Sequence, residues 1–171
     1  LNIIHDLKHT FVLTLICCFD LFNFINRNCQ CIDGCVDNVC INADSTNMLA
    51  YWQRAVSQSL FNNYEASRGM DVRLLAAKAE ADFDAAIKLA PDNAYLYFDR
   101  GNLRCSVKNY SHAIDDYTKA ISLNPDIAEV YFNRGLAYLK LGNKQQAVAD
   151  LSKAGELGLY DAYSIIKQQQ K

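Results

Sequence analysis

The residue type best suited to chemistry in this 171-residue chain is cysteine, which is concentrated near the N-terminus. Cys29, Cys31, Cys35 and Cys40 form the pattern C-x-C-x3-C-x4-C. Such a cluster can form two short-loop disulfides in an oxidising compartment, or ligate zinc in a reducing one, although C-x-C is not the usual zinc spacing. Unpaired thiols in a leader are the third alternative. Because the spacing does not choose among them, we assign no metal ligand and no cofactor.

Catalytic groupings are nearly absent from the rest of the sequence. His112 falls on the outward side of a predicted helix, so no nucleophile can be paired with it. Asp115 and Asp116 are adjacent, and adjacent helical residues point about 100° apart, so we expect one exposed and one ion-paired carboxylate. Cys105 has no neighbouring base and is expected to be a small helix residue near the core. The sequence therefore predicts a protein that is not an enzyme.

Composition and charge restrict the class of protein. Hydrophobic residues make up 51% and charged residues 21%, which gives enough apolar side chain to bury a core and argues against global disorder. Lys+Arg 17 against Asp+Glu 19 gives a net charge of -2. This balance lacks the basic excess that neutralises phosphate backbones, so no nucleic-acid partner is expected.

Residues 11–19 form an apolar run that resembles the core of a signal peptide more than a membrane span. Asp20 interrupts the run, and a spanning helix needs roughly 20 largely apolar residues. No clear small-x-small cleavage site precedes Cys29. Two alternatives stay open. If residues 11–25 act as a signal or anchor, as one alternative has it, the protein is exported or membrane-associated; otherwise, as with a non-native leader, it is cytoplasmic.

An internal repeat dominates the rest of the chain. Its period is the spacing between Pro91 and Pro125, and the residues around the two prolines recur in register. The first copy contributes Ala94, Tyr97, Phe98, Arg100, Gly101, Asn109, Ala113, Asp116, Lys119 and Ala120, each of which recurs one period later. One period before the first copy, Ala79, Phe83, Ala86 and Pro91 form half of an earlier one.

Each copy predicts two antiparallel helices. The prolines end one helix, Asp92 and Asp126 are expected to cap the next, and helix A then runs to Val107 or Leu141. Asn109 and Asn143 precede helix B, over 111–123 and 144–157. Small residues, Gly101, Gly135 and the helix-B alanines, let the two backbones approach closely. Asp116 follows Arg100 at the same spacing at which Asp150 follows Arg134, which predicts an ion pair across each hairpin.

This pattern resembles the tetratricopeptide repeat. The resemblance rests on Tyr97-x2-Arg100-Gly101, Ala113-x3-Tyr117-x2-Ala120 and Pro125, and on their equivalents Tyr131-x2-Arg134-Gly135 and Ala147-x3-Leu151-x2-Ala154. It covers residues 94–157 well and residues 71–93 as a second helix only. The sequence Tyr131-Phe132-Asn133-Arg134-Gly135 is similar to that of bacterial arrays. The implied fold is an all-α helix-turn-helix solenoid of two and a half to three repeats with a C-terminal capping helix.

The resemblance divides the chain into five segments. A leader with the cysteine cluster occupies 1–44, an irregular first repeat 45–93, two regular repeats 94–127 and 128–159, and the cap 160–171. In the first repeat a long helix over 45–66 carries the stripe Leu49, Trp52, Val56, Leu60 and Tyr64. In the cap, Tyr163 and Ile166 are expected to point inward. So short an array needs its N-terminal helix, a second copy of the chain or a ligand to complete the core.

In the family, the inner faces of the A helices line a concave groove that binds a protein or peptide segment. The resemblance implies a scaffold or adaptor, with the alternatives of a membrane-attached or exported assembly factor, or an accessory to a Cys-rich redox or metal domain. A clamp for a C-terminal carboxylate is not matched, because Phe98 and Phe132 stand where such a clamp places polar or basic groups. The implied partner-binding residues are Tyr95, Phe98, Asp99, Asn102, Glu129, Phe132, Asn133, Leu136 and Lys140.

Overall fold

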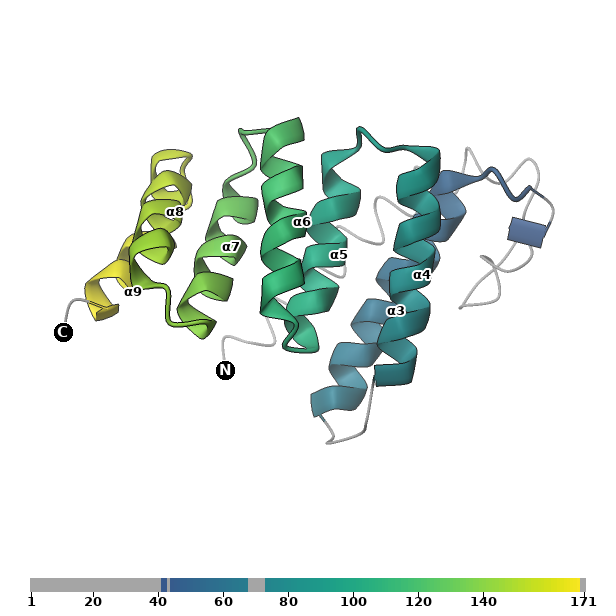
Figure 1. Cartoon of the computed structure of the whole chain (residues 1–171), viewed down its shortest axis with the longest axis horizontal. Coiled ribbons are helices and arrows are strands. Elements are labelled where there is room, and N and C mark those ends of the chain that lie inside the picture. The colour runs from purple at the N-terminus through teal and green to yellow at the C-terminus, as the bar shows by residue number, and fades with distance from the viewer. Residues whose placement is uncertain (1–40, 43, 68–72, 170–171) are drawn as a thin grey trace. The chain divides into compact units, whose positions relative to one another are not determined.

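The computed structural model describes residues 41, 42, 44–67 and 73–169, and the chain divides into two units, Leu1–Ser45 and Thr46–Lys171. The apolar run and the four clustered cysteines lie outside the described residues. In the described part of the second unit there are seven helices and no strand (Figure 1). They are α3 Met48–Ser67, α4 Arg73–Leu89, α5 Ala94–Ser106, α6 Tyr110–Leu123, α7 Ala128–Lys140, α8 Lys144–Glu156 and α9 Asp161–Gln169.

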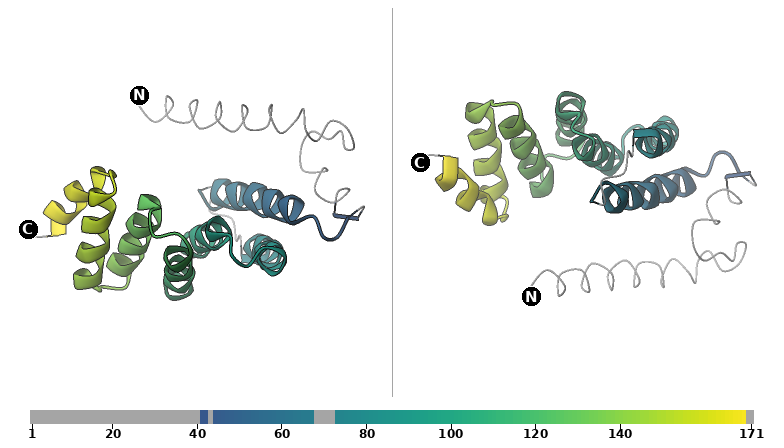
Figure 2. Two further views of the ribbon diagram at one scale, coloured as in Figure 1. Left: turned by 90° about the horizontal axis from the view of Figure 1, so that it is seen from above. Right: turned by 90° about the horizontal axis from the view of Figure 1, so that it is seen from below.

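The helices pack as hairpins, α3 with α4, α5 with α6 and α7 with α8, and α9 packs on α8. Their axes turn relative to one another along the array (Figure 2). The turns after α5 and α7 lie on one edge of the array, and the turns after α4 and α6 lie on the opposite edge (Figure 1). The predicted all-α repeat solenoid with a C-terminal capping helix is therefore confirmed.

Close approach of the two helices in a hairpin explains the repeated glycines. A Cβ on Gly101 would lie 2.6 Å from Cε1 of Tyr117, and one on Gly135 would lie 3.0 Å from Cγ of Leu151. Tyr117 and Leu151 are themselves 1% and 0% exposed, so neither can easily move aside. Because a side chain at either glycine would overpack the hairpin core, the small residue sets the spacing between helix A and helix B.

The predicted ion pairs across the hairpins are confirmed, and each is bidentate. Nε and Nη2 of Arg100 donate to Asp116 over 3.0 and 2.6 Å, and the same atoms of Arg134 donate to Asp150 over 2.7 and 2.7 Å. Both carboxylates are buried. Planar two-point contacts of this kind satisfy buried carboxylates and fix the angle between the partners.

The same arginines also reach back to the preceding hairpin. Nη1 of Arg100 donates to Asp84 on α4, and Nη1 of Arg134 donates to Thr118 on α6. Thr118 stands one repeat period after Asp84, so these contacts recur in register with the ion pairs. Each arginine thus joins two successive B helices to its own A helix.

The first hairpin has an equivalent Arg–Asp ion pair, but its arginine does not stand at the position that the repeat period gives. Asp82 stands one period before Asp116 and is 7% exposed, whereas the position one period before Arg100 is Ala66. Arg54 of α3 supplies the missing guanidinium, with Nε 2.6 Å from Oδ2 of Asp82. The shifted α3, which begins at Met48, brings Arg54 to this position.

Two expectations about helix ends were wrong. Asp92 and Asp126 lie in turns, and the N-cap positions are Asn93, whose side chain accepts a bond from the Tyr95 amide, and Ile127, which has no side-chain cap. The reason is that the Pro-Asp pair is used to form the turn, so the helices begin at Ala94 and Ala128, one residue later than caps at Asp92 and Asp126 would place them. Asn109 and Asn143 stand at N-cap positions, as predicted, without side-chain capping bonds.

The buried stripe predicted for the first helix was partly wrong. Trp52 and Val56 pack against the core, but Leu49 is 36% and Leu60 is 63% exposed, because among the described helices α3 packs mainly on α4. The side chain of Tyr64 lies outside the described residues. In α9, Ala162 is the buried residue and Ile166 packs on the core. Tyr163 contacts the Gly155 position yet is 47% exposed, so its predicted inward position holds only in part.

We expect Asp116→Ala to lower the free energy of unfolding by about 3–5 kcal/mol, because two guanidiniums, those of Arg100 and Arg104, lose a buried partner. Urea unfolding followed by circular dichroism measures the loss. Asp115→Ala is the matched control, since Asp115 is exposed and should change stability by no more than about 0.5 kcal/mol. Equal effects of the two substitutions would contradict the role of the ion pair.

Lys108 adopts a φ of 64°, and its equivalent one period later, Gly142, adopts a φ of 80°. A side chain in this left-handed region costs about 1 kcal/mol or more, a cost that glycine avoids. Lys108→Gly should therefore raise the free energy of unfolding by about 1 kcal/mol in the urea assay. The same exchange at exposed Lys78, inside α4, should lower it by a similar amount. A loss at both positions would refute the backbone argument.

Candidate functional site

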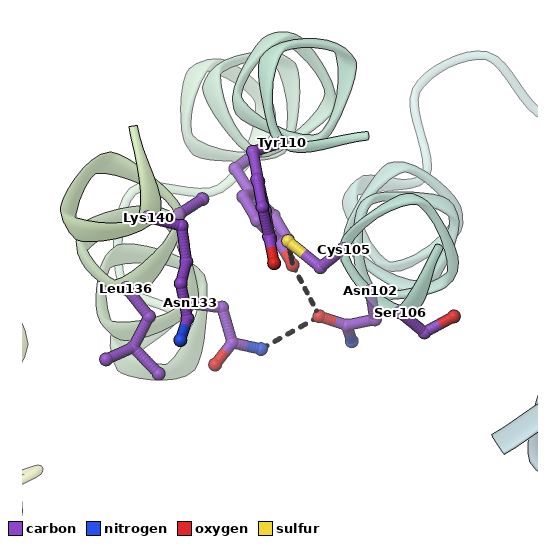
Figure 3. Close-up of a pocket in the computed structure, with 9 residues that line it drawn as sticks. Asn102, Cys105, Ser106, Tyr110, Asn133, Leu136 and Lys140 are labelled. Carbon is purple, nitrogen blue, oxygen red and sulfur yellow. Dashed lines mark hydrogen bonds between the residues drawn. The ribbon is translucent and has the colours of Figure 1, made fainter. Parts of the chain in front are cut away.

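A pocket of about 360 Å³ opens between α5, α6 and α7 (Figure 3). One wall comes from α5, the opposite wall from α7, and Tyr110 of α6 lies between them. Tyr117 of α6 also lines the pocket. The lining residues are Asn102, Cys105, Ser106, Tyr110, Tyr117, Asn133, Leu136, Ala137 and Lys140. The successive A helices α5 and α7 thus form its two sides.

A pair of amide side chains joins the two walls. Nδ2 of Asn133 donates to Oδ1 of Asn102 over 2.8 Å, and the Tyr117 hydroxyl donates to the same oxygen over 2.8 Å. Among the described residues, none bonds to Nδ2 of Asn102 or to Oδ1 of Asn133. Both of these atoms point to the side of the pair away from Tyr110 (Figure 3). One free donor and one free acceptor are therefore presented side by side.

The inner part of the pocket is uncharged. The Tyr117 hydroxyl lies 3.4 Å from Sγ of Cys105. Burial raises the pKa of the Tyr117 hydroxyl far above its usual range, and burial also raises the pKa of the Cys105 thiol despite the hydrogen bond from Tyr117. The raised pKa values favour the protonated forms of both groups at neutral pH.

Only some of the predicted binding residues line this pocket. Four of them, Asn102, Asn133, Leu136 and Lys140, line the pocket. Tyr95 and Glu129 are exposed in the first turns of α5 and α7, outside the lining. These two remain predictions without a pocket contact.

The two predicted phenylalanines are occupied by packing. Phe98 packs against the core, with its ring centroid 6.1 Å from that of Tyr117. Phe132 packs against the cluster that contains Leu151 and Ala154. Because both rings support neighbouring helices, truncating either would disturb the core as well as any bound partner.

Asp99 is covered by the first helix of the array. Nε1 of Trp52, on α3, donates to Oδ2 of Asp99 over 2.8 Å. Burial raises the pKa of Asp99, and the bond from Trp52 partly opposes that rise. Asp99 is thus held by the indole of Trp52 instead of facing the pocket, an arrangement that the repeat period did not predict.

Five lining residues were not among the predicted binding residues. Cys105 and Ser106 follow Asn102 by three and four positions, so the helical period indicated that all three share one face. Ala137 follows Asn133 by four in the same way. Tyr110 and Tyr117 come from helix B, and only the packing of α6 behind the two walls places them here.

Two other kinds of site would involve a metal ion or a membrane. In the part of the chain that the structure describes, no group of three or more His, Cys, Asp or Glu side chains is placed to hold a metal ion. None of the described helices is both long enough and apolar enough to cross a membrane.

Two family models match the chain: "TPR repeat" over residues 101–142 and "Tetratricopeptide repeat" over residues 128–158. No curated protein matches it. The chain is similar to a crystal structure of MamA with a TM-score of 0.63 and 22% identity, over 77% of this chain and 71% of that one. A second MamA crystal structure gives a TM-score of 0.56 and 27% identity, over 72% of this chain and 61% of that one.

Two further structural neighbours are TPR domains. The first TPR of Spaghetti (RPAP3), bound to the HSP90 peptide SRMEEVD, has a TM-score of 0.54 and 21% identity, over 68% of this chain and 90% of that one. The Arabidopsis OM64 TPR domain has a TM-score of 0.53 and 24% identity, over 69% of this chain and 95% of that one. These similarities extend beyond the segments that the family models match and show the fold.

Replacing Trp52 by phenylalanine removes the donor to Asp99 and raises the pKa of that carboxyl further. A raised folded-state pKa makes stability fall as pH rises from the unfolded value through the folded one. We expect Trp52→Phe to lower the free energy of unfolding by about 1–3 kcal/mol at neutral pH, and by less at acidic pH where Asp99 is protonated. Urea unfolding across pH measures this. In an Asp99→Asn background the pH dependence of the loss should disappear; if it persists, another group is responsible.

Proposed function

This chain carries tetratricopeptide repeats, and from that premise we propose that it is a non-enzymatic scaffold or adaptor that binds an extended peptide segment between α5 and α7. The repeats and the repeat domains to which the chain is similar support a protein-interaction module. One similar domain was solved with a peptide, which supports a peptide as the kind of ligand.

The observation that carries the proposal is the pair of free amide atoms at Asn102 and Asn133. A residue in an extended backbone directs its own N–H and C=O to the same edge of the strand, so its carbonyl can accept from Nδ2 of Asn102 while its N–H donates to Oδ1 of Asn133. The two amides hold each other through their own hydrogen bond, and the Tyr117 hydroxyl fixes Asn102 from behind. This arrangement orders the site before a ligand arrives, which lowers the entropy cost of binding.

Leu136 and the ring of Tyr110, both partly exposed, supply the apolar surface that a bound segment needs. In interfaces, a few well-packed anchors contribute most of the binding free energy and surrounding polar groups set orientation. The pocket combines both elements, because the amide pair, Tyr110 and Leu136 all line it. The second alternative, an exported or membrane-attached assembly factor, depends on residues 11–25 and stays a prediction, as does a role for the cysteine cluster.

The test is selection of binders to the full chain from a displayed library of random dodecapeptides, followed by fluorescence anisotropy with the selected peptides. Asn133→Ala combined with Leu136→Asp should weaken binding at least about tenfold, because it removes a backbone contact and puts a charge on the apolar wall. Circular dichroism should show an unchanged helical signal.

Gln146→Ala is the control variant, since Gln146 is exposed on α8 and does not line the pocket. It should bind the selected peptides as the unmodified chain does. If the library yields no peptide whose affinity depends on Asn133 and Leu136, the proposed binding site is wrong.

A further inference from the structure

One carboxylate on the inner side of the array has no cationic partner among the described residues. Asp99 of α5 is partly buried, and its Oδ2 accepts the bond from Nε1 of Trp52 over 2.8 Å. Burial raises the pKa of Asp99 and only the bond from Trp52 opposes the rise, as expected where no cation stands beside a carboxylate. Asp99 therefore differs from the carboxylates of the hairpin ion pairs, each of which is held by a guanidinium.

The repeat itself indicates that this negative charge is not needed to join neighbouring A helices. Asn133 stands one period after Asp99, and its Nδ2 donates to Asn102 on the preceding A helix, α5. Asp99 makes the corresponding link to its own preceding A helix, α3, through Trp52. A neutral amide thus joins the helices in the next repeat, whereas a partly buried carboxylate carries a desolvation cost that an amide avoids. The charge of Asp99 is therefore expected to have a role beyond packing.

Trp52 occupies one oxygen of the Asp99 carboxylate, and the other oxygen is exposed. Oδ1 of Asp99 has no hydrogen-bond partner among the described residues. The buried side-chain atoms that lack such a partner in the described part of the chain belong to Gln58 and Asn62, so Oδ1 is open to solvent. A charged acceptor with free lone pairs is thus available to a ligand.

The two helices that meet at Asp99 supply no cation to it. Arg54 is the cation of α3, and its guanidinium is bonded to Asp82. The cations of α5 are Arg100 and Arg104, and both are bonded to carboxylates of α4 and α6. The negative charge of Asp99 is therefore left for a group from outside these two helices.

Aromatic side chains accompany the free oxygen. Trp52 is partly exposed, and its N–H lies in the plane of the indole, so a group on the ring face also lies beside the carboxylate. Tyr95 precedes Asp99 by one helical turn on the same face of α5 and is 49% exposed. A carboxylate beside aromatic rings suits a guanidinium, because the oxygen accepts its N–H groups and a ring contacts its planar face.

From this arrangement we propose that Asp99, Trp52 and Tyr95 form a binding site for the guanidinium of an arginine side chain on a partner protein. The guanidinium donates to Oδ1 of Asp99 and packs its planar face on an aromatic ring. The peptide site at Asn102 and Asn133 uses other atoms. The inference therefore goes beyond the proposed function and can fail without it.

Trp52 is the only tryptophan of the chain, so its indole N–H gives a single nuclear magnetic resonance signal that reports on this site. The full chain is titrated at constant ionic strength with the peptide Gly-Ser-Arg-Ser-Gly, blocked at both ends, and with the same peptide carrying citrulline in place of arginine. Citrulline keeps a planar group with N–H donors and removes the charge. The arginine peptide should shift the signal saturably and bind at least about tenfold tighter than the citrulline peptide.

Substitutions then test the residues. Asp99→Asn keeps an oxygen that can accept from Trp52 and removes the charge, so it should weaken binding of the arginine peptide at least about tenfold with an unchanged circular dichroism signal. Asp115→Asn makes the same charge change on the exposed surface of α6 and should bind as the unmodified chain does. Tyr95→Ala removes an exposed ring and should weaken binding about threefold.

Two results would overturn the guanidinium site. One is equal binding of the arginine and citrulline peptides, or no saturable shift with either. The other is an equal loss in Asp99→Asn and Asp115→Asn, which would show a general effect of net charge. If Asp99→Asn changes the circular dichroism signal, the comparison of the two peptides on the unmodified chain decides. None of these results affects the library peptides, whose binding is tested at Asn133 and Leu136.

Discussion

The architecture depends on pairing a buried carboxylate in each B helix with an arginine from an A helix. Asp82, Asp116 and Asp150 recur once in every period and are buried in all three hairpins. A buried charge without a partner is costly, so each of these residues requires its guanidinium, and the planar two-point contact allows few relative orientations of the two helices. The glycines then set how closely those helices approach.

The pocket follows from this constraint. Arg100 and Arg134 fix α5 and α7 against successive B helices, and as a result the amides of Asn102 and Asn133 meet at 2.8 Å. The tyrosine that fills the gap opposite Gly101 also donates its hydroxyl to Asn102. Tyr117 therefore serves both the core and the site, and a substitution there would not separate stability from binding.

The first hairpin shows how the same constraint tolerates a different helix. The period places no arginine at residue 66, yet Asp82 is buried and must be paired, and Arg54 from the shifted α3 supplies the pair. The shift has a second consequence, because it brings Trp52 over Asp99. The inner surface that the repeat presents at α5 is thus closed on one side by the irregular helix, and the open pocket lies between α5 and α7.

The repeat period determined the all-α hairpins, the Arg–Asp pairs and the close contact at Gly101 and Gly135, because each follows from spacing along a helix or from identities one period apart. Four of the residues that line the pocket were implied by the resemblance to the repeat family. The tertiary structure alone decided the contacts between segments that the repeat period does not relate. The position of α3, the Trp52–Asp99 bond, the packing of Phe98 and Phe132 and the contribution of Tyr110 join segments with no common register. Such contacts depend on which surfaces remain uncovered once the hairpins have packed, and that is a property of the assembled array.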